Sequence, residues 1–304
     1  MRQALNAATD ALRAAGIETP RLDAEFLLVE ATGWDRARLA AEPGAEIPSA
    51  AARRFAEMVR RRLRREPVAY IVGRRGFRRI ELAVDRRVLI PRPETELLVE
   101  LAVEMEPERV LDVGTGSGAI ALAVADELPE CEVVAVDTSR AALEVARANA
   151  ERLDLADRVS FHQGTLPPGD AGFDLVLANL PYVSEADWPG LEPEVTEWEP
   201  REALLAGRDG LDAIRSLFLS DRVHPSSSIW RIKAKSPGGC LGLEVGEGQA
   251  EAVGELMREA GFEAIEVRKD LAGIERVVVG RAHSADFAFL RPMDPKKTKS
   301  AADG

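Results

Sequence analysis

Cysteine is scarce in this sequence, and the two that it contains, Cys131 and Cys240, lie far apart. Neither has histidine or cysteine neighbours at zinc-ligand spacing, so neither a disulfide framework nor a metal site is expected. A long apolar run is also missing, and the amino-terminal stretch MRQALNAATDALRAAG lacks the apolar centre of a signal peptide. We therefore expect a cytoplasmic protein without a membrane partner.

Positive charge is in deficit, because the 304 residues carry a formal net charge of -12. This balance argues against a general binder of nucleic acid or membrane surfaces, so any basic surface must be local. The hydrophobic fraction of 46% can supply the cores of an ordinary domain and a smaller one. Two domains are therefore expected, and stable nucleic-acid binding is not.

A small helical domain is predicted over residues 1–66. Apolar residues fall at helical spacing over 5–16 and 21–32, and again after Ser49. Gly16 and Gly33 stand where C-terminal caps would end the first two helices, and Ser49 is a suitable N-cap for the third.

The third predicted helix and the stretch after it are rich in arginine. The cluster consists of Arg53, Arg54, Arg60, Arg61, Arg62, Arg64, Arg65, Arg74, Arg75, Arg78 and Arg79. A solvated face explains such a cluster, and so does a surface that steers RNA or an acidic partner protein. The sequence favours the first interpretation and leaves the second open.

A β-hairpin is predicted to link the domains over residues 67–93. The segment is rich in β-forming residues, alternates around Leu82, and is interrupted by Gly73 and Gly76. The hexapeptide PRPETE, residues 91–96, then leads into an apolar helix over 97–104, and Pro93 suits the first turn of that helix.

A glycine loop opens the second domain, predicted over residues 94–280. A short apolar strand, 110–113, is followed by Gly114-Thr115-Gly116-Ser117-Gly118 and an apolar helix over 119–128. Glycines permit a tight turn and close approach of the backbone to a ligand, and the helix N-terminus offers unpaired N–H groups. The loop alone is a weak signal that a dinucleotide site would also give.

An acidic residue ends the next predicted strand, 132–136, at Asp137. A carboxylate there can accept hydrogen bonds from both hydroxyls of a ribose, although it can also cap the helix predicted over 139–154. A third strand, 159–162, is followed by a loop whose Leu166 could border an adenine ring.

A fourth strand, 174–178, ends at Asn179-Leu180-Pro181-Tyr182. Asparagine and proline are common turn residues, so a plain turn explains the tetrapeptide when it is taken alone. However, the glycine loop, Asp137 and this tetrapeptide all follow strands, and ligands of open α/β sheets bind at the carboxyl ends of strands. The same groups could therefore hold a planar acceptor that bears an amide or amine.

The remaining chain alternates strands and helices less regularly. A helix is predicted from 211 to 219, an irregular or poorly ordered segment over 220–237, and a disordered tail from 281 to 304. Between them the pattern predicts strands at 240–245, 264–268 and 276–280 and a helix at 249–260.

Taken in order, these motifs resemble the class I methyltransferases that use S-adenosylmethionine and, among them, the PrmC/HemK family. The similar segments are AYIVGRRGF, VLIPRPETELLVE, LDVGTGSGAIALA, ANLPYV, EPREALLAGRDGLDAIR, LEVGEGQ and RKDLAGIERVVVG. The resemblance implies a Rossmann-like, seven-stranded α/β sheet with a small helical domain that recognises the substrate. It also implies methylation of the glutamine side-chain amide in the Gly-Gly-Gln motif of class 1 peptide chain release factors, with S-adenosylhomocysteine as by-product.

The resemblance assigns roles residue by residue. The implied cofactor-binding residues are Asp112, Gly114, Thr115, Gly116, Ser117, Gly118, Asp137, Leu166 and Asn179. Substrate binding falls to Asn179, Leu180, Pro181 and Tyr182, of which Asn179, Pro181 and Tyr182 are implied to be catalytic. The family more often has proline at position 180, an acidic residue at 165, and a helix and turn within 220–237. Leucine at 180 keeps the backbone carbonyl that the site is expected to use.

Two other functions are compatible with parts of the pattern. A methyltransferase for the exocyclic amine of adenine or guanine would use the same tetrapeptide on a flipped base. The RPETE segment and the absence of an added target-recognition domain disfavour it. A non-catalytic cofactor-binding protein is disfavoured because the glycine loop, Asp137 and Asn179 are all present.

Overall fold

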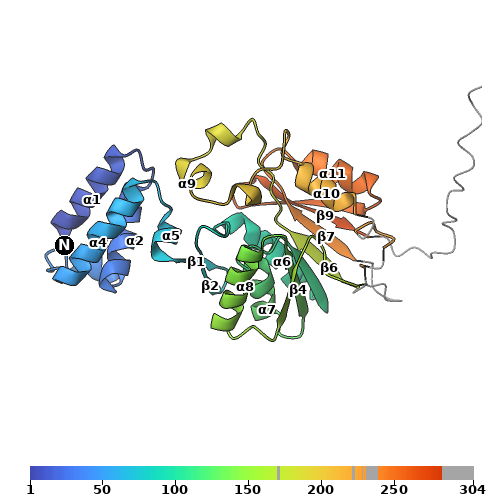
Figure 1. Cartoon of the computed structure of the whole chain (residues 1–304), viewed down its shortest axis with the longest axis horizontal. Coiled ribbons are helices and arrows are strands. Elements are labelled where there is room, and N and C mark those ends of the chain that lie inside the picture. Colours follow the sequence, from blue (N-terminus) through green and yellow to red (C-terminus); the bar gives the residue numbers. More distant parts are fainter. Residues whose placement is uncertain (170–171, 221–222, 228, 231–238, 283–304) are drawn as a thin grey trace, which may run out of the picture.

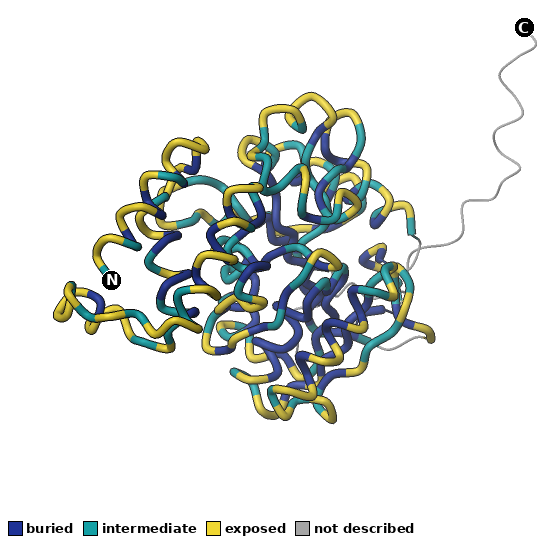
Figure 2. The backbone as a smooth tube through the Cα atoms, turned by 60° about the vertical axis from the view of Figure 1, so that its left-hand side comes forward, coloured by how far each residue is buried: buried dark blue, intermediate teal, exposed yellow. Residues whose placement is uncertain are grey.

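The computed structural model describes residues 1–169, 172–220, 223–227, 229–230 and 239–282. A helical bundle at the amino terminus lies beside a larger sheet domain that has helices on both faces (Figure 1). Buried backbone is concentrated in the centre of the molecule, and the outer turns are exposed (Figure 2). Among these residues no helix combines the length and the apolar character needed to cross a membrane.

The bundle is built from α1 (Arg2–Ala14), α2 (Pro20–Thr32), α3 (Arg36–Ala41) and α4 (Ser49–Leu63). Its core is apolar and includes residues of every one of these helices. Ser49 was predicted to be the N-cap of the third helix, α4, but the N-cap is Pro48 and Ser49 is the first helical residue. No side chain caps this helix. The short helix α3, capped by Asp35, is too brief to show a clear periodicity in the sequence.

The linking segment is only partly β-structured. Its start forms a helix, α5 (Val68–Val72), which Gly73 ends in the left-handed conformation. The hairpin follows as β1 (Arg74–Phe77) and β2 (Ile80–Ala83), and Gly76 lies inside β1 instead of interrupting the strand. The five-residue apolar run of α5 suits a strand or a helix equally, so the prediction of β-structure was wrong there.

The second domain contains the predicted seven-stranded sheet, in the order β5-β4-β3-β6-β7-β9-β8. Its strands are β3 (Arg109–Val113), β4 (Glu132–Asp137), β5 (Val159–Gln163), β6 (Leu175–Ala178), β7 (Cys240–Glu244), β8 (Glu263–Lys269) and β9 (Glu275–Arg281). The first five are parallel, while β9 runs antiparallel to both β7 and β8. Each strand lies within one residue of its predicted bounds at either end.

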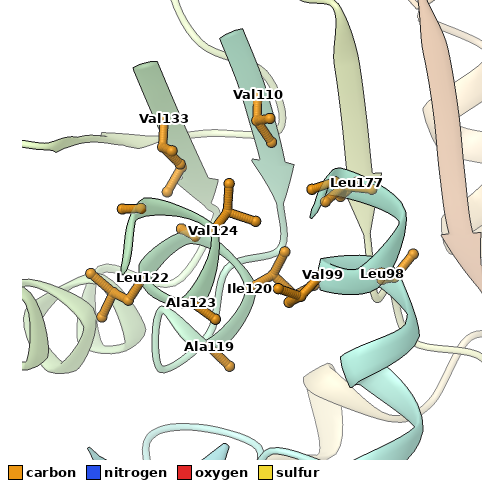
Figure 3. Close-up of a cluster of buried hydrophobic side chains, with 14 of the residues drawn as sticks. Leu98, Val99, Val110, Ala119, Ile120, Leu122, Ala123, Val124, Val133 and Leu177 are labelled. Carbon is orange, nitrogen blue, oxygen red and sulfur yellow. The ribbon is translucent and has the colours of Figure 1, made fainter. Parts of the chain in front are cut away.

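Helices cover both faces of this sheet. One face packs against α6 (Glu96–Met105), α7 (Ala119–Glu127) and α8 (Arg140–Arg152). Figure 3 shows apolar side chains of α6 and α7 against those of β3, β4 and β6. The opposite face packs against α10 (Asp212–Phe218) and α11 (Ala250–Glu259). Short helices η1 (Pro93–Thr95), η2 (Trp188–Gly190), α9 (Pro193–Thr196) and η3 (Arg201–Ala203) lie in the connections.

The chain reverses its direction of strand addition between β3 and β6. From β3 it builds outward through β4 and β5, and it then returns to place β6 on the other side of β3. At such a switch point the two connections leave in opposite directions and open a crevice at the carboxyl ends of the strands. The glycine loop after β3 and the tetrapeptide after β6 both begin there.

Buried charges join the bundle to the sheet domain. Arg62 of α4 is almost fully buried and pairs with Asp23 at 2.7 Å and with Glu194 of α9 at 2.6 Å. Nearby, Arg65 pairs with Glu192 at 2.7 Å. Most of the arginine cluster is similarly paired with acidic side chains of the same chain, which favours the interpretation as a solvated face.

Two predicted irregular segments lie largely outside the described residues. Of the segment predicted irregular over 220–237, residues 221–222, 228 and 231–237 lie outside the described residues. The described part forms bends and turns and ends at Trp230, which is buried and contacts Phe262 edge-on. The tail predicted from 281 also falls outside, except for Arg281, which ends β9, and the buried Ala282.

Candidate active site

A cavity of about 350 Å³ opens at the switch point of the sheet. Its wall brings together five of the residues singled out at strand ends: Gly114, Gly116, Asp137, Leu166 and Asn179. Leu180 and Pro181 complete the edge that β6 contributes. The cavity therefore unites the three motifs that are separate in the sequence.

The glycine loop is held by backbone hydrogen bonds to the neighbouring strand. The N–H groups of Gly114 and Thr115 both donate to the carbonyl of Val136, at 2.9 and 3.0 Å. Gly114 adopts a positive φ of 77°, and a Cβ there would lie 3.3 Å from Leu180 Cδ2 and 3.6 Å from the Asn179 carbonyl oxygen. A side chain at this position would thus intrude between the loop and the end of β6. Glycine keeps the loop close to this strand end, as the binding of a ligand with a nucleoside and an amino-acid end requires.

The carboxylate of Asp137 stands beside this loop on the cavity wall. One oxygen accepts from the N–H of Gly116 at 2.9 Å, and the other accepts from the N–H of Ser139 at 2.8 Å. The helix cap itself is supplied by the Ser139 hydroxyl, which accepts from the N–H of Ala142. Each carboxylate oxygen can accept more than one hydrogen bond, so Asp137 retains capacity for ligand hydroxyls.

Several residues in and before the glycine loop lie behind the cavity wall and do not line the cavity. Asp112 is fully buried, and one of its oxygens accepts from the Thr115 hydroxyl at 2.6 Å and from the N–H of Ala121 at 3.2 Å. Ser117 is also buried, and its carbonyl accepts from the Asn149 side chain at 2.9 Å. The structure thus places these groups where they fix the shape of the loop.

Burial raises the pKa of Asp112 to about 7, partly offset by its hydrogen bonds with Thr115 and Ala121. In the unfolded chain the same carboxyl titrates near pH ~4. Between these values the folded protein holds a proton that the unfolded chain has released, so the free energy of unfolding falls as pH rises. Each unit of pKa difference corresponds to about 1.4 kcal/mol.

Replacing this carboxyl should flatten the pH dependence of stability. Asp112→Asn keeps the acceptor oxygen for Thr115 and Ala121 but cannot ionise, so its loss of stability from pH 5 to pH 8 should be smaller than in the wild type. Urea unfolding at several pH values measures the two slopes. Equal slopes would show that Asp112 does not titrate in this window.

The tetrapeptide after β6 presents its groups in two directions. Asn179, Leu180 and Pro181 line the cavity, and the Asn179 side-chain nitrogen donates to the Thr95 hydroxyl at 3.0 Å. Tyr182 turns away from the wall, and its hydroxyl lies 3.4 Å from a carboxyl oxygen of Glu244. The carboxamide oxygen of Asn179 is therefore the part of this side chain left for an acceptor.

The rest of the wall has residues to which no site role was assigned from the sequence, although many lie in the family-like segments VLIPRPETELLVE and EPREALLAGRDGLDAIR. It comes from the stretch before η1, from η3 and its flank, and from α10: Arg87, Val88, Leu89, Pro200, Glu202, Ala203, Ala213, Ser216, Leu217 and Ser220. Tertiary contacts hold the first stretch, since Tyr70 donates to the Val88 carbonyl at 2.6 Å and Glu199 accepts from the N–H of Ile90 at 2.9 Å.

Metal ligands are not gathered at this site. Within the parts of the chain that the structure describes, no group of three or more His, Cys, Asp or Glu side chains is placed to hold a metal ion. The chemistry that the cavity offers is hydrogen bonding from backbone groups, the Asn179 carboxamide and several hydroxyls, together with the charges of Asp137, Glu202 and Arg87.

Comparison with known proteins identifies both domains. The PrmC N-terminal domain matches residues 3–73, and a methyltransferase domain matches residues 110–198. The release factor glutamine methyltransferase of Caulobacter vibrioides is 41% identical over 91% of this chain and 95% of its own length. That of Moorella thermoacetica is 42% identical over 91% of this chain and 96% of its own length.

Solved structures support the fold. The catalytic domain of hMettl16, solved in complex with an RNA hairpin of MAT2A, superposes with a TM-score of 0.52 at 15% identity, over 66% of this chain and 76% of that chain. At this identity the likeness concerns the arrangement of strands and helices alone. The sequence relatives decide the family, and the chain belongs to the release factor glutamine methyltransferases.

Proposed function

We propose that this protein transfers a methyl group from S-adenosylmethionine to the side-chain amide nitrogen of the glutamine in the Gly-Gly-Gln motif of class 1 peptide chain release factors. The observation that carries the proposal is the meeting of the glycine loop, Asp137 and Asn179 around one cavity in a chain about 40% identical to release factor glutamine methyltransferases. Such an enzyme acts where translation ends, in the cytoplasm.

The cofactor site is assigned to the wall between β3 and β5. The backbone of Gly114 and Gly116 would hold the amino-acid end, Asp137 the ribose hydroxyls, and Leu166 the adenine ring. When bound, S-adenosylmethionine supplies a methyl group already activated by its sulfonium. The buried groups Asp112, Thr115, Ser117 and Gly118 would act indirectly, by keeping the loop in its ligand-binding shape.

The acceptor site is assigned to the tetrapeptide. An amide nitrogen is a poor nucleophile because its lone pair is delocalised into its carbonyl. The Asn179 carboxamide oxygen and the main-chain carbonyl of Leu180 or Pro181 would each accept one N–H of the substrate amide. These contacts would fix the nitrogen in line for attack and favour the positive charge that builds on it. Tyr182, which the sequence assigned to the substrate, lies behind this edge with its hydroxyl on Glu244, so it would support the tetrapeptide instead of touching the amide. No general base is needed beforehand, because the proton can leave after transfer.

The helical bundle is assigned to recognition of the release factor. It corresponds to the family-specific PrmC N-terminal domain, whereas the sheet domain carries the cavity. The paired state of most clustered arginines argues against RNA as the partner of this surface.

A labelling experiment tests the proposed function. The protein is incubated with cofactor carrying a labelled methyl group and, separately, with purified release factor, the same factor with its motif glutamine replaced, and RNA. We expect label only on the unaltered factor. Label that survives the glutamine replacement, or that appears on RNA alone, would assign another substrate.

A further inference from the structure

The RPETE segment, residues 92–96, contacts the proposed acceptor site through Thr95. Ala178 pairs with Leu243 across β6 and β7, so the next residues, Asn179 and Glu244, are neighbours at the carboxyl ends of these strands. Thr95, at the end of η1, is 3% exposed and accepts from the Asn179 side chain at 3.0 Å. The same hydroxyl is close enough to the Glu244 carboxyl to lower the pKa of that group.

The contact with Thr95 does not by itself orient Asn179. A hydroxyl can donate or accept, so either end of the Asn179 carboxamide could face it. The reversed arrangement would turn the side-chain nitrogen toward the cavity, where its hydrogens would oppose those of a substrate amide. The orientation therefore depends on where the single Thr95 hydroxyl hydrogen points.

Glu244 supplies the group that decides this direction. An ionised carboxylate accepts hydrogen bonds and cannot donate. If the Thr95 hydrogen is directed at Glu244, the Thr95 oxygen is left to accept from the Asn179 nitrogen, and the Asn179 oxygen must face the cavity. The Tyr182 hydroxyl lies 3.4 Å from the same carboxyl, so both hydroxyls converge on one acceptor.

We infer that Thr95 and Glu244 are positioning residues for methyl transfer, which set the direction of the Asn179 carboxamide so that its oxygen faces the substrate amide. The inference rests on the proposed function and names two residues that do not touch the reacting atoms. Glu244 is 1% exposed and its Oε2 has no hydrogen-bond partner among the described residues, so this buried carboxyl keeps an acceptor oxygen available for the Thr95 hydroxyl.

Glu244 should change its charge near neutral pH, because opposing effects act on its pKa. Burial raises its pKa to about 7; the carboxyl of Glu94 on η1 adds to the rise, and the hydroxyls of Thr95 and Tyr182 and the guanidinium of Arg276 on β9 oppose it. Burial also raises the pKa of Tyr182, which keeps its hydroxyl proton. A protonated Glu244 could donate to Thr95 and allow the reversed carboxamide, so the rate should fall below about pH 7.

Substitutions at Thr95 test the hydroxyl. Thr95→Val removes it with little change in shape, and we expect kcat for the release factor to fall about ten- to hundredfold, while the dissociation constant for the cofactor stays within about twofold. Thr95→Ser keeps the hydroxyl and should recover most of the rate. Thr9→Val removes a buried hydroxyl that bonds the Leu5 carbonyl in α1, so it should lower the melting temperature similarly and leave kcat unchanged.

Glu244→Gln tests the acceptor, and it keeps the experiment decisive if Thr95→Val does not fold. A carboxamide can donate or accept, so this variant should show a kcat about tenfold lower and should lose the pH step near 7 that the wild type shows. Wild-type kcat in Thr95→Val, or an unchanged pH profile in Glu244→Gln, would overturn the inference. Failure of the wild type to methylate the factor would instead overturn the proposed function.

Discussion

Asn179→Ala is expected to lower turnover of the release factor by about 10² to 10³ and to leave the cofactor bound. Removal of one preorganised polar contact to a developing charge costs this much in enzymes that stabilise an oxyanion, and we propose the equivalent task for the Asn179 oxygen at a developing cation. Single-turnover rates with saturating labelled cofactor measure the effect, and titration of the cofactor measures binding separately.

The side-chain amide of Asn149, which is fully buried, provides the control for that experiment. Asn149 donates to the carbonyls of Ala83 and Ser117 and accepts from the N–H of Ala83, so its side chain holds α8 to the hairpin and the glycine loop. Asn149→Ala should therefore lower the melting temperature, because it leaves buried backbone groups unpaired. Asn179→Ala should leave the melting temperature nearly unchanged. Undiminished turnover in Asn179→Ala would remove this residue from the mechanism.

The sequence pattern was sufficient for the long elements of the fold. The central strands β3, β4, β6 and β7 are short, mainly apolar runs, and α1, α4 and α8 have clear helical spacing. Short segments could not be predicted in the same way. The helix α5 spans five apolar residues, Val68–Val72, and its helical state is decided by Pro67 before it, Gly73 after it and packing against the bundle.

The residues of the candidate site also fall into those that the sequence places together and those that only the packing of the fold brings there. Gly114, Asp137 and Asn179 follow strands directly, and parallel strands bring their carboxyl ends to one edge, so the sequence places them together. The side chain of Asp112 belongs to a strand that is buried on both faces, and the sequence does not reveal that it points beneath the loop. Nor does it bring Thr95 to Asn179, because these residues meet only after α6 packs on the sheet.

The two sides of the cavity, the glycine loop and the end of β6, are in direct contact with each other. The end of β6 lies against the glycine loop, with the Asn179 carbonyl and the Leu180 side chain nearest to Gly114. A change in the loop should therefore disturb the proposed acceptor edge as well as the proposed cofactor wall. Leu180 contributes to this contact with its side chain, in addition to the role proposed for its carbonyl.

Gly114→Ala is accordingly expected to impair both binding and chemistry. Its φ of 77° is costly for a residue with a Cβ, by about 1 to 2 kcal/mol, and the new methyl group would press on Leu180. A loop that relaxes to relieve this strain must give up its paired hydrogen bonds to Val136. We expect cofactor affinity to fall at least about tenfold, measured by calorimetric titration, with a further loss of kcat at saturating cofactor.

Gly76→Ala is the matched control, because this glycine lies in β1 with no atom within 4 Å of an added Cβ and does not adopt a positive φ. It should bind cofactor and turn over like the wild type. If Gly114→Ala also bound cofactor normally, the tight approach of the loop to the ligand would be excluded. If it lost affinity but kept its kcat, the loop would serve the cofactor alone, and the acceptor edge at Asn179 would be positioned independently, by Thr95 and the end of β6.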